Sequence, residues 1–238
     1  THYPENIEIA RTITEQEAKR DGRNEEQVYV PSLAKDLLEQ ISFEARESEY
    51  IDVKSGVSAR MSITAFENLL STAERRSLMA GDDKTTVRLG DFMGMIPAIT
   101  GKVELVYEGE QEGAASVAHT LIGDAIQTLF VTYFPEIKKL EKQNEKSPYD
   151  EVVTWFFDQS DFQLLDDLTE EAYKKMLDSV TPLQNLIDTH QPDLPKEDQY
   201  FMKEFILWAL VEFKKLSKYR MTDGMRFKDL YGSYISGL

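Results

Sequence analysis

The sequence predicts an all-α fold made of two consecutive helical bundles. Apolar residues recur at helical spacing over several long segments, and glycine or proline stands near the ends of most of them. Only residues 85–88 and 103–107 have the composition of a short extended segment. The chain has 238 residues, of which 41% are hydrophobic, so it is long and apolar enough to bury a sizeable core.

The first half of the chain contains three clear helical patterns. Residues 4–21 form the first predicted helix, with Pro4 near its opening turn and Asp21-Gly22 at its end. The second helix begins at Pro31-Ser32. The third covers residues 59–80 and ends at Gly81. The residues expected to face the core on the second and third helices are Leu33, Leu37, Leu38, Ile41, Ala45, Ile63, Phe66, Leu69, Leu70 and Ala73.

Less regular segments separate and follow these helices. Residues 50–58 predict a loop, residues 85–87 a short extended segment, and residues 89–99 a return to helical spacing. After a possible strand at 103–107 comes a segment rich in glutamate and glycine. We place the main boundary there, so that the expected domains are residues 1–107 and 108–238.

The second half is also predicted to be helical. Residues 114–133 have the clearest apolar stripe in the chain, ended by Pro135. Residues 138–146 predict an exposed helix or a linker, because almost every position is charged or polar. Further helices are expected at 161–180 and 197–219. The tail after Arg220 has weak turn signals and is expected to fray.

The composition disfavours several classes of partner. There are 27 basic and 43 acidic residues, which gives a net charge of −16. The chain has no cysteine. A surface this negative repels phosphate backbones and anionic lipids, so neither nucleic acid nor membrane is an expected partner. The excess of acid also serves solubility, which is the simpler interpretation. Because no signal peptide and no apolar run of membrane-spanning length is evident, the expected location is cytoplasmic.

Sequence motifs for catalysis are missing. The nearest match to a P-loop, Gly94 to Gly101-Lys102, has too many residues between its glycines and no hydroxyl residue after the lysine. His2, His119 and His190 lie far apart, so no zinc site is predicted. We therefore expect no catalytic residue, cofactor or metal in this chain itself. The polar start at Thr1 suggests a piece of a longer protein.

One arginine stands out. In the segment Lys54-Ser55-Gly56-Val57-Ser58-Ala59-Arg60-Met61, a glycine-serine loop leads Arg60 into the first turn of the third helix. A cation there opposes the helix dipole by a few tenths of a kcal/mol. The functional interpretation of Arg60 is that its guanidinium reaches out to bind a phosphate. The alternative is a local ion pair with Asp52 or Glu49, which is the commoner role of a surface arginine.

A second candidate is acidic. Glu108, Glu110 and Glu112 alternate with glycine and glutamine, which would suit a cation-binding loop. They lack the full ligand set of a calcium loop, so a solvated linker whose charges favour the next helix is the preferred interpretation.

The order of elements around Arg60 resembles that of a known family. The segment Ser55-Gly56-Val57-Ser58-Ala59-Arg60 at a helix start is similar to the sensor-2 region of AAA+ ATPases related to the magnesium chelatase ATPase subunit. The similarity continues through the helix that ends at Ala80-Gly81, then through Thr86-Val87-Arg88-Leu89-Gly90-Asp91-Phe92 to Met95-Ile96-Pro97. It covers roughly residues 1–107, whereas residues 108–238 have no counterpart and are expected to be a helical extension.

The resemblance implies a role within a larger assembly. Residues 1–107 would form the lid, and Arg60 would be the sensor-2 arginine that contacts the γ-phosphate of ATP in the assembled ring, held by a neighbouring subunit. ATP and Mg²⁺ would be bound by the upstream ATPase core of the parent protein. The partners that the resemblance implies are that core, neighbouring ring subunits and a further protein.

A different class of function stays open at this point. The chain could be a stand-alone helical interaction module without nucleotide chemistry. Its docking surface would then be the aromatic face around Trp155, Phe156, Trp208 and Phe213. If these rings are buried they belong to the core, which is the expected outcome.

Overall fold

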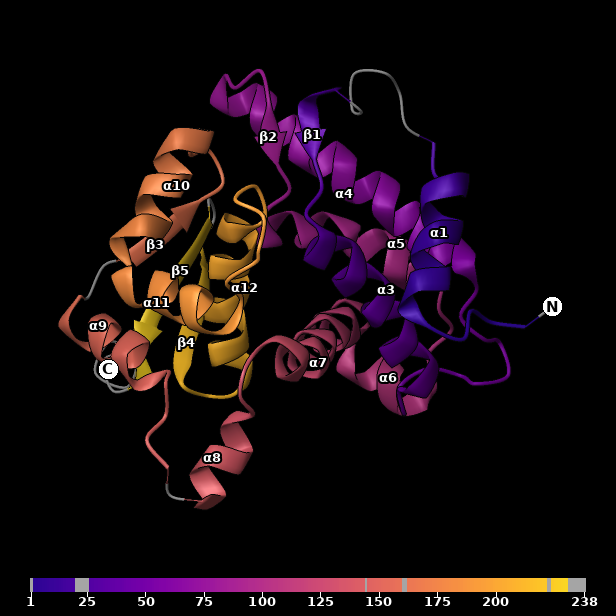
Figure 1. The fold of residues 1–238 in the computed structure, drawn as a ribbon. Helices are drawn as coiled ribbons and strands as arrows, with labels where there is room; N and C mark the ends of the chain where they lie inside the picture. The colour runs from indigo at the N-terminus through magenta and orange to yellow at the C-terminus, as the bar shows by residue number, and fades with distance from the viewer. Residues whose placement is uncertain (1, 20–25, 144, 160–161, 222–223, 231–238) are drawn as a thin grey trace. The chain divides into compact units, whose positions relative to one another are not determined.

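The computed structural model describes residues 2–19, 26–143, 145–159, 162–221 and 224–230. The described chain is mostly helical and falls into two compact units (Figure 1). The first unit contains residues 1–78 and 83–125, and the second contains 79–82 and 126–238. This division rests on the density of contacts along one polypeptide, so the boundary expected at 107/108 stays a prediction.

The first unit consists mainly of helices. Its elements in chain order are α1 (Ile7–Glu17), β1 (Val28–Tyr29), α3 (Ser32–Glu47), α4 (Ala59–Ala80), β2 (Thr85–Thr86), the 3-10 helix η1 (Leu89–Met95), α5 (Ile96–Thr100), α6 (Tyr107–Glu112) and the first part of α7 (Ala114–Tyr133). The predicted helix that begins at Pro31-Ser32 and the predicted helix at 59–80 are confirmed. The first helix is shorter than expected, because Asn6 caps its start and the backbone turns extended at Ala18; Asp21-Gly22, the expected end, lies outside the described residues.

A small parallel sheet joins two distant parts of the first unit. Val28 pairs with Thr85 and Tyr29 with Thr86. The amide of Val87 also donates to the carbonyl of Tyr29 at 2.9 Å. The expected extended segment at 85–88 is therefore present. The one expected at 103–107 is reduced to a single antiparallel bridge between Ile51 and Leu105, because Tyr107 already begins α6.

The second unit combines helices with a three-stranded sheet. Its remaining elements are α8 (Ile137–Gln143), α9 (Asp150–Asp158), β3 (Phe162–Leu165), α10 (Glu170–Ser179), α11 (Thr181–His190), α12 (Gln199–Glu212), β4 (Leu216–Met221) and β5 (Gly224–Asp229). The sheet is antiparallel with the order β3-β5-β4. Figure 1 shows it beside α10, α11 and α12.

Strictly all-α is therefore wrong for this chain, and three expectations in the second half fail with it. The helix predicted at 161–180 begins only at Glu170, because Phe162 and Leu164 face the core from β3 at a strand period. The tail after Arg220, expected to fray, contributes strand β5.

The helix predicted at 197–219 ends at Glu212 for a local reason. Lys214 has a φ of 58°. Its amide donates to the carbonyl of Val211, and the amide of Lys215 donates to the carbonyl of Leu210. This is a Schellman cap with lysine at the left-handed position that glycine usually occupies. Because lysine stands where glycine is usual, the sequence contains no signal that the helix ends at Glu212.

Helix α7 forms at residues 114–133, where the sequence has its clearest apolar stripe. It is the one helix in the described ranges that is long and apolar enough to cross a membrane, contrary to the expectation from the sequence. Half of the relevant window is buried within the protein. Burial of this kind is typical of the core helix of a soluble protein.

Candidate functional site

The loop before α4 is held in place by backbone hydrogen bonds. The amides of Ser55 and Gly56 donate to the carbonyl of Asp52, at 3.1 and 3.3 Å, and the amide of Asp52 donates to the carbonyl of Glu104 at 2.8 Å. A carboxylate oxygen of Asp52 accepts the amide of Lys54 at 2.9 Å. The loop is thus tied both to itself and to the segment that precedes α6.

Gly56 is required by the geometry of this loop. Its φ is +68°, a conformation that side-chain-bearing residues rarely adopt. A Cβ atom at this position would lie 2.2 Å from the hydroxyl oxygen of Tyr3. The glycine of the predicted glycine-serine loop is therefore a point of close approach by the N-terminal segment.

The loop also has apolar anchors on either side of Arg60. Val57 and Met61 are both 1% exposed. The amide of Met61 donates to the carbonyl of Ser58 at 2.9 Å, which closes the first turn of α4. The backbone that carries Arg60 is thus anchored by buried side chains before and after it.

Arg60 itself is exposed at the second position of α4. No hydrogen bond, ion pair or ring contact joins its side chain to another residue in the part of the chain that the structure describes. Asp52, one of the two suggested local partners, instead accepts the amide of Lys54. The local ion pair with Asp52 or Glu49 is therefore not formed among these residues.

The second sequence candidate takes a different form from the one expected. Glu108, Glu110 and Glu112 belong to helix α6 and not to a loop, and all three are exposed. Glu108 and Glu112, four residues apart, share one side of the helix, but Glu110 points to a different side, so the three carboxylates do not converge on one cation. Within the described ranges no group of three or more potential ligands could hold a metal ion.

A buried ion pair that sequence analysis missed links α4 to η1. Arg76 Nε and Nη2 donate to the two carboxylate oxygens of Asp91, both at 2.9 Å, and side-chain exposure is 7% and 3%. The same guanidinium donates to Thr85 Oγ1 and to the carbonyl of Thr86. The amide of Arg88 donates to Asp91 at 2.8 Å. This network ties β2 and η1 to α4 and serves the fold.

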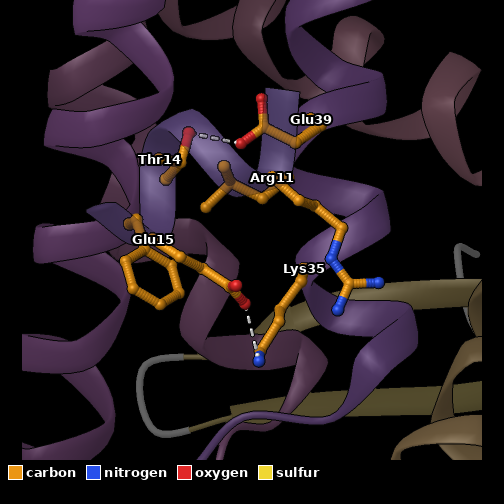
Figure 2. Close-up of a pocket in the computed structure, with 7 residues that line it drawn as sticks. Arg11, Thr14, Glu15, Lys35 and Glu39 are labelled. Atoms are coloured by element: carbon orange, nitrogen blue, oxygen red, sulfur yellow. Dashed lines mark hydrogen bonds and ion pairs between the residues drawn. The ribbon is translucent and has the colours of Figure 1, made fainter. Parts of the chain in front are cut away.

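A shallow pocket lies where α1, α3 and α4 meet (Figure 2). Figure 2 shows Thr14 and Glu39 at one end, joined by a 2.5 Å hydrogen bond, and Lys35 with Glu15 at the other, joined by a 2.8 Å ion pair. Arg11 lines the pocket but pairs with Asp36 at 2.7 Å. The charged groups of the pocket are thus paired between α1 and α3. We call these paired residues, Arg11, Thr14, Glu15, Lys35, Asp36 and Glu39, the polar seam.

Glu39 gives this seam a predicted pH dependence. Its side chain is buried, and this burial raises its pKa, although the hydrogen bond from Thr14 opposes the shift. Because the folded state then holds its proton more tightly than the unfolded state, stability is lost as the pH rises through the folded pKa.

Replacing Glu39 with glutamine is expected to remove this loss while keeping an acceptor for Thr14. The difference in free energy of unfolding between the Glu39→Gln variant and the native chain should shift in favour of the variant from pH 4 to pH 8. Urea unfolding monitored by far-UV circular dichroism measures it. Parallel stability curves for the two proteins across this range would contradict the assignment.

The aromatic face considered for docking is largely interior. Phe156 is 0% and Trp208 1% exposed, and the Lys218 ammonium lies 3.8 Å from the centre of the Trp208 ring system. Trp155 and Phe213 are half-buried. Phe157, next to Phe156 on α9, is exposed at 66%.

The chain matches no protein-family model, no curated protein and no solved structure.

Proposed function

We propose that this chain is the non-catalytic C-terminal helical region of a magnesium-chelatase-like AAA+ ATPase of the cytoplasm. In this proposal the first part is the lid and Arg60 is its sensor-2 arginine, placed against the phosphates of ATP in the assembled ring. ATP and Mg²⁺ belong to the upstream core of the parent protein. The extension after residue 107 offers surface for ring or partner contacts.

The observation that carries the proposal is the state of Arg60. It is exposed in the first turn of a 22-residue helix and has no side-chain partner among the described residues. The helix start adds its own partial positive charge to that of the guanidinium. An unpaired cation at such a position is destabilising on its own and becomes favourable when an anion binds.

The chemistry of arginine suits a phosphate partner. Its planar fork presents several donors in fixed geometry and stays charged at any physiological pH. The rest of the chain has a large negative net charge, so an anionic ligand has few other attractive surfaces here. The loop anchored by Val57 and Met61 fixes the point from which the side chain reaches out.

Removing the guanidinium tests the proposal. In the full-length ATPase that it implies, Arg60→Ala is expected to lower ATP turnover about 100-fold, the cost of losing one donor to a developing charge. Arg60→Lys should recover only part of the rate, because lysine lacks the bidentate fork.

Arg75→Ala is the matched control. Arg75 is exposed on the same helix and has no side-chain partner in the described chain. The Arg75→Ala variant should therefore leave ATP turnover unchanged. Equal activity of the Arg60→Ala and native enzymes would rule out the assignment of Arg60.

The alternative function, a stand-alone helical interaction module, requires an exposed docking face. Phe156 and Trp208 are buried, which argues against these two rings as docking residues. The two functions differ in one simple observation: the ATPase proposal requires a Walker A and B pair in the same polypeptide.

A further inference from the structure

Arg46 contacts the loop that leads to Arg60. It lies in the last turn of α3, and its Nε donates to the carbonyl of Val57 at 3.3 Å while Nη2 donates to Ser42 Oγ at 3.2 Å. The guanidinium carbon is 4.7 Å from the centre of the Tyr3 ring and 4.9 Å from that of Phe43. One side chain therefore joins α3, the N-terminal segment and the loop.

These contacts depend on the shape of arginine as well as on its charge. No carboxylate in the described ranges lies within ion-pair distance of Arg46, and its Nη1 is buried without a hydrogen-bond partner there. A lysine could replace the charge, but its single ammonium could not reproduce the separate donors to Val57 and Ser42 while also lying over the Tyr3 ring. The two hydrogen bonds and the ring contacts of Arg46 together fix the position of the Val57 carbonyl relative to α3.

The same cluster covers Gly56. The hydroxyl of Tyr3 fills the space in which a Cβ at Gly56 would stand, and Arg46 lies against the ring of the same tyrosine. Arg46 thus fixes the carbonyl of Val57 directly and the position of Gly56 through Tyr3. Arg60 follows three residues after Val57, with one buried anchor on each side.

We propose that Arg46 is a positioning residue for Arg60: it holds the Gly56–Val57 loop in the conformation from which Arg60 enters α4 and projects outward. The functional part of this inference rests on the proposed role of Arg60. The structural part concerns the loop alone and can be tested separately.

Amide hydrogen exchange of the chain tests the structural part. The amides of Ser55 and Gly56 bond to Asp52 within the loop, whereas that of Val87 bonds to Tyr29 in another part of the first unit. Arg46→Lys is expected to speed exchange at Ser55 and Gly56 about five- to tenfold, the effect of losing one hydrogen bond of ordinary net strength and a stacking contact. Exchange at Val87 should change less than about twofold.

Arg11→Lys is the matched control, since Arg11 bonds to Ser32 and Asp36 and not to the loop. It should leave loop exchange unchanged. If Arg46→Lys does not fold, Tyr3→Leu replaces it, because Tyr3 is half exposed near the start of the chain and its loss removes one face of the stack. Unaltered exchange at Ser55 and Gly56, or an equal rise at Val87, overturns the proposal.

A double-mutant cycle in the full-length ATPase tests the functional part. Arg46→Lys should lower kcat about tenfold and leave the KM for ATP within about twofold, since the nucleotide is held by the core. Combined with Arg60→Ala it should add nothing further. Independent, multiplying effects on kcat would overturn the coupling. If Arg60→Ala alone is silent, the proposed function fails while the exchange result still decides the role of Arg46 in the loop.

Discussion

Asp91→Ala is expected to lower the free energy of unfolding of the first unit by about 3–5 kcal/mol, because it leaves a buried arginine without its counter-charge. Asp91 accepts both donors of the Arg76 fork and the amide of Arg88, and it is 3% exposed. Its removal therefore orphans three donors at once. The loss should appear in urea unfolding followed by far-UV circular dichroism.

Two comparisons make this result specific to the buried network. Lys35→Ala removes an ion pair with Glu15 in the same unit that is much more exposed, and it should cost no more than about 1 kcal/mol. Asp91→Asn should fall between Asp91→Ala and the native chain, because the amide keeps one acceptor but turns a donor toward Arg76. A loss below about 1 kcal/mol for Asp91→Ala would show that the network contributes little.

Phe130→Ala is expected to destabilise the second unit by a similar amount, about 3–5 kcal/mol, through the cavity it leaves. Phe130 is 0% exposed, and its ring lies 5.1 to 6.2 Å from four other rings, those of Phe134, Tyr149, Phe213 and Phe205. Both tryptophans of the chain, Trp155 and Trp208, belong to this unit. Tryptophan fluorescence therefore follows its unfolding directly.

Phe157→Ala provides the control for this core. Its ring is 66% exposed on α9, so its removal should change the free energy of unfolding by less than about 0.5 kcal/mol. Equal losses for Phe130→Ala and Phe157→Ala would mean that the aromatic cluster is not the centre of the second unit.

The helices were predictable from sequence where one face repeats over many turns. The patterns at 32–45, 59–80 and 114–133 each predicted a helix that the structure contains. The sheet β3-β5-β4 was not predictable, because short strands depend on partners far along the chain. Leu164, Leu165 and Leu168 fit a helical spacing equally well, and only pairing with β5 reveals Leu164 as a strand residue.

The candidate site was predictable only in part. The glycine-serine segment identified Arg60 and its helix, but nothing local links Arg46 to Val57 or Tyr3 to Gly56, since these contacts arise from tertiary packing. The buried Arg76 did leave a signal. It continues the apolar spacing of Leu69 and Ala73 on α4, and a charged residue on a buried stripe needs a buried partner.

The pairing of β1 with β2 has a consequence for synthesis of the chain. Val28, Tyr29 and Val30 favour extended structure, yet the partner of Val28 is Thr85, which leaves the ribosome only after all of α3 and α4. At ordinary translation rates this delay is roughly 3–11 seconds. During that interval an apolar strand is available to chaperones or to another nascent chain, and the first unit cannot close until translation has passed the end of its longest helix.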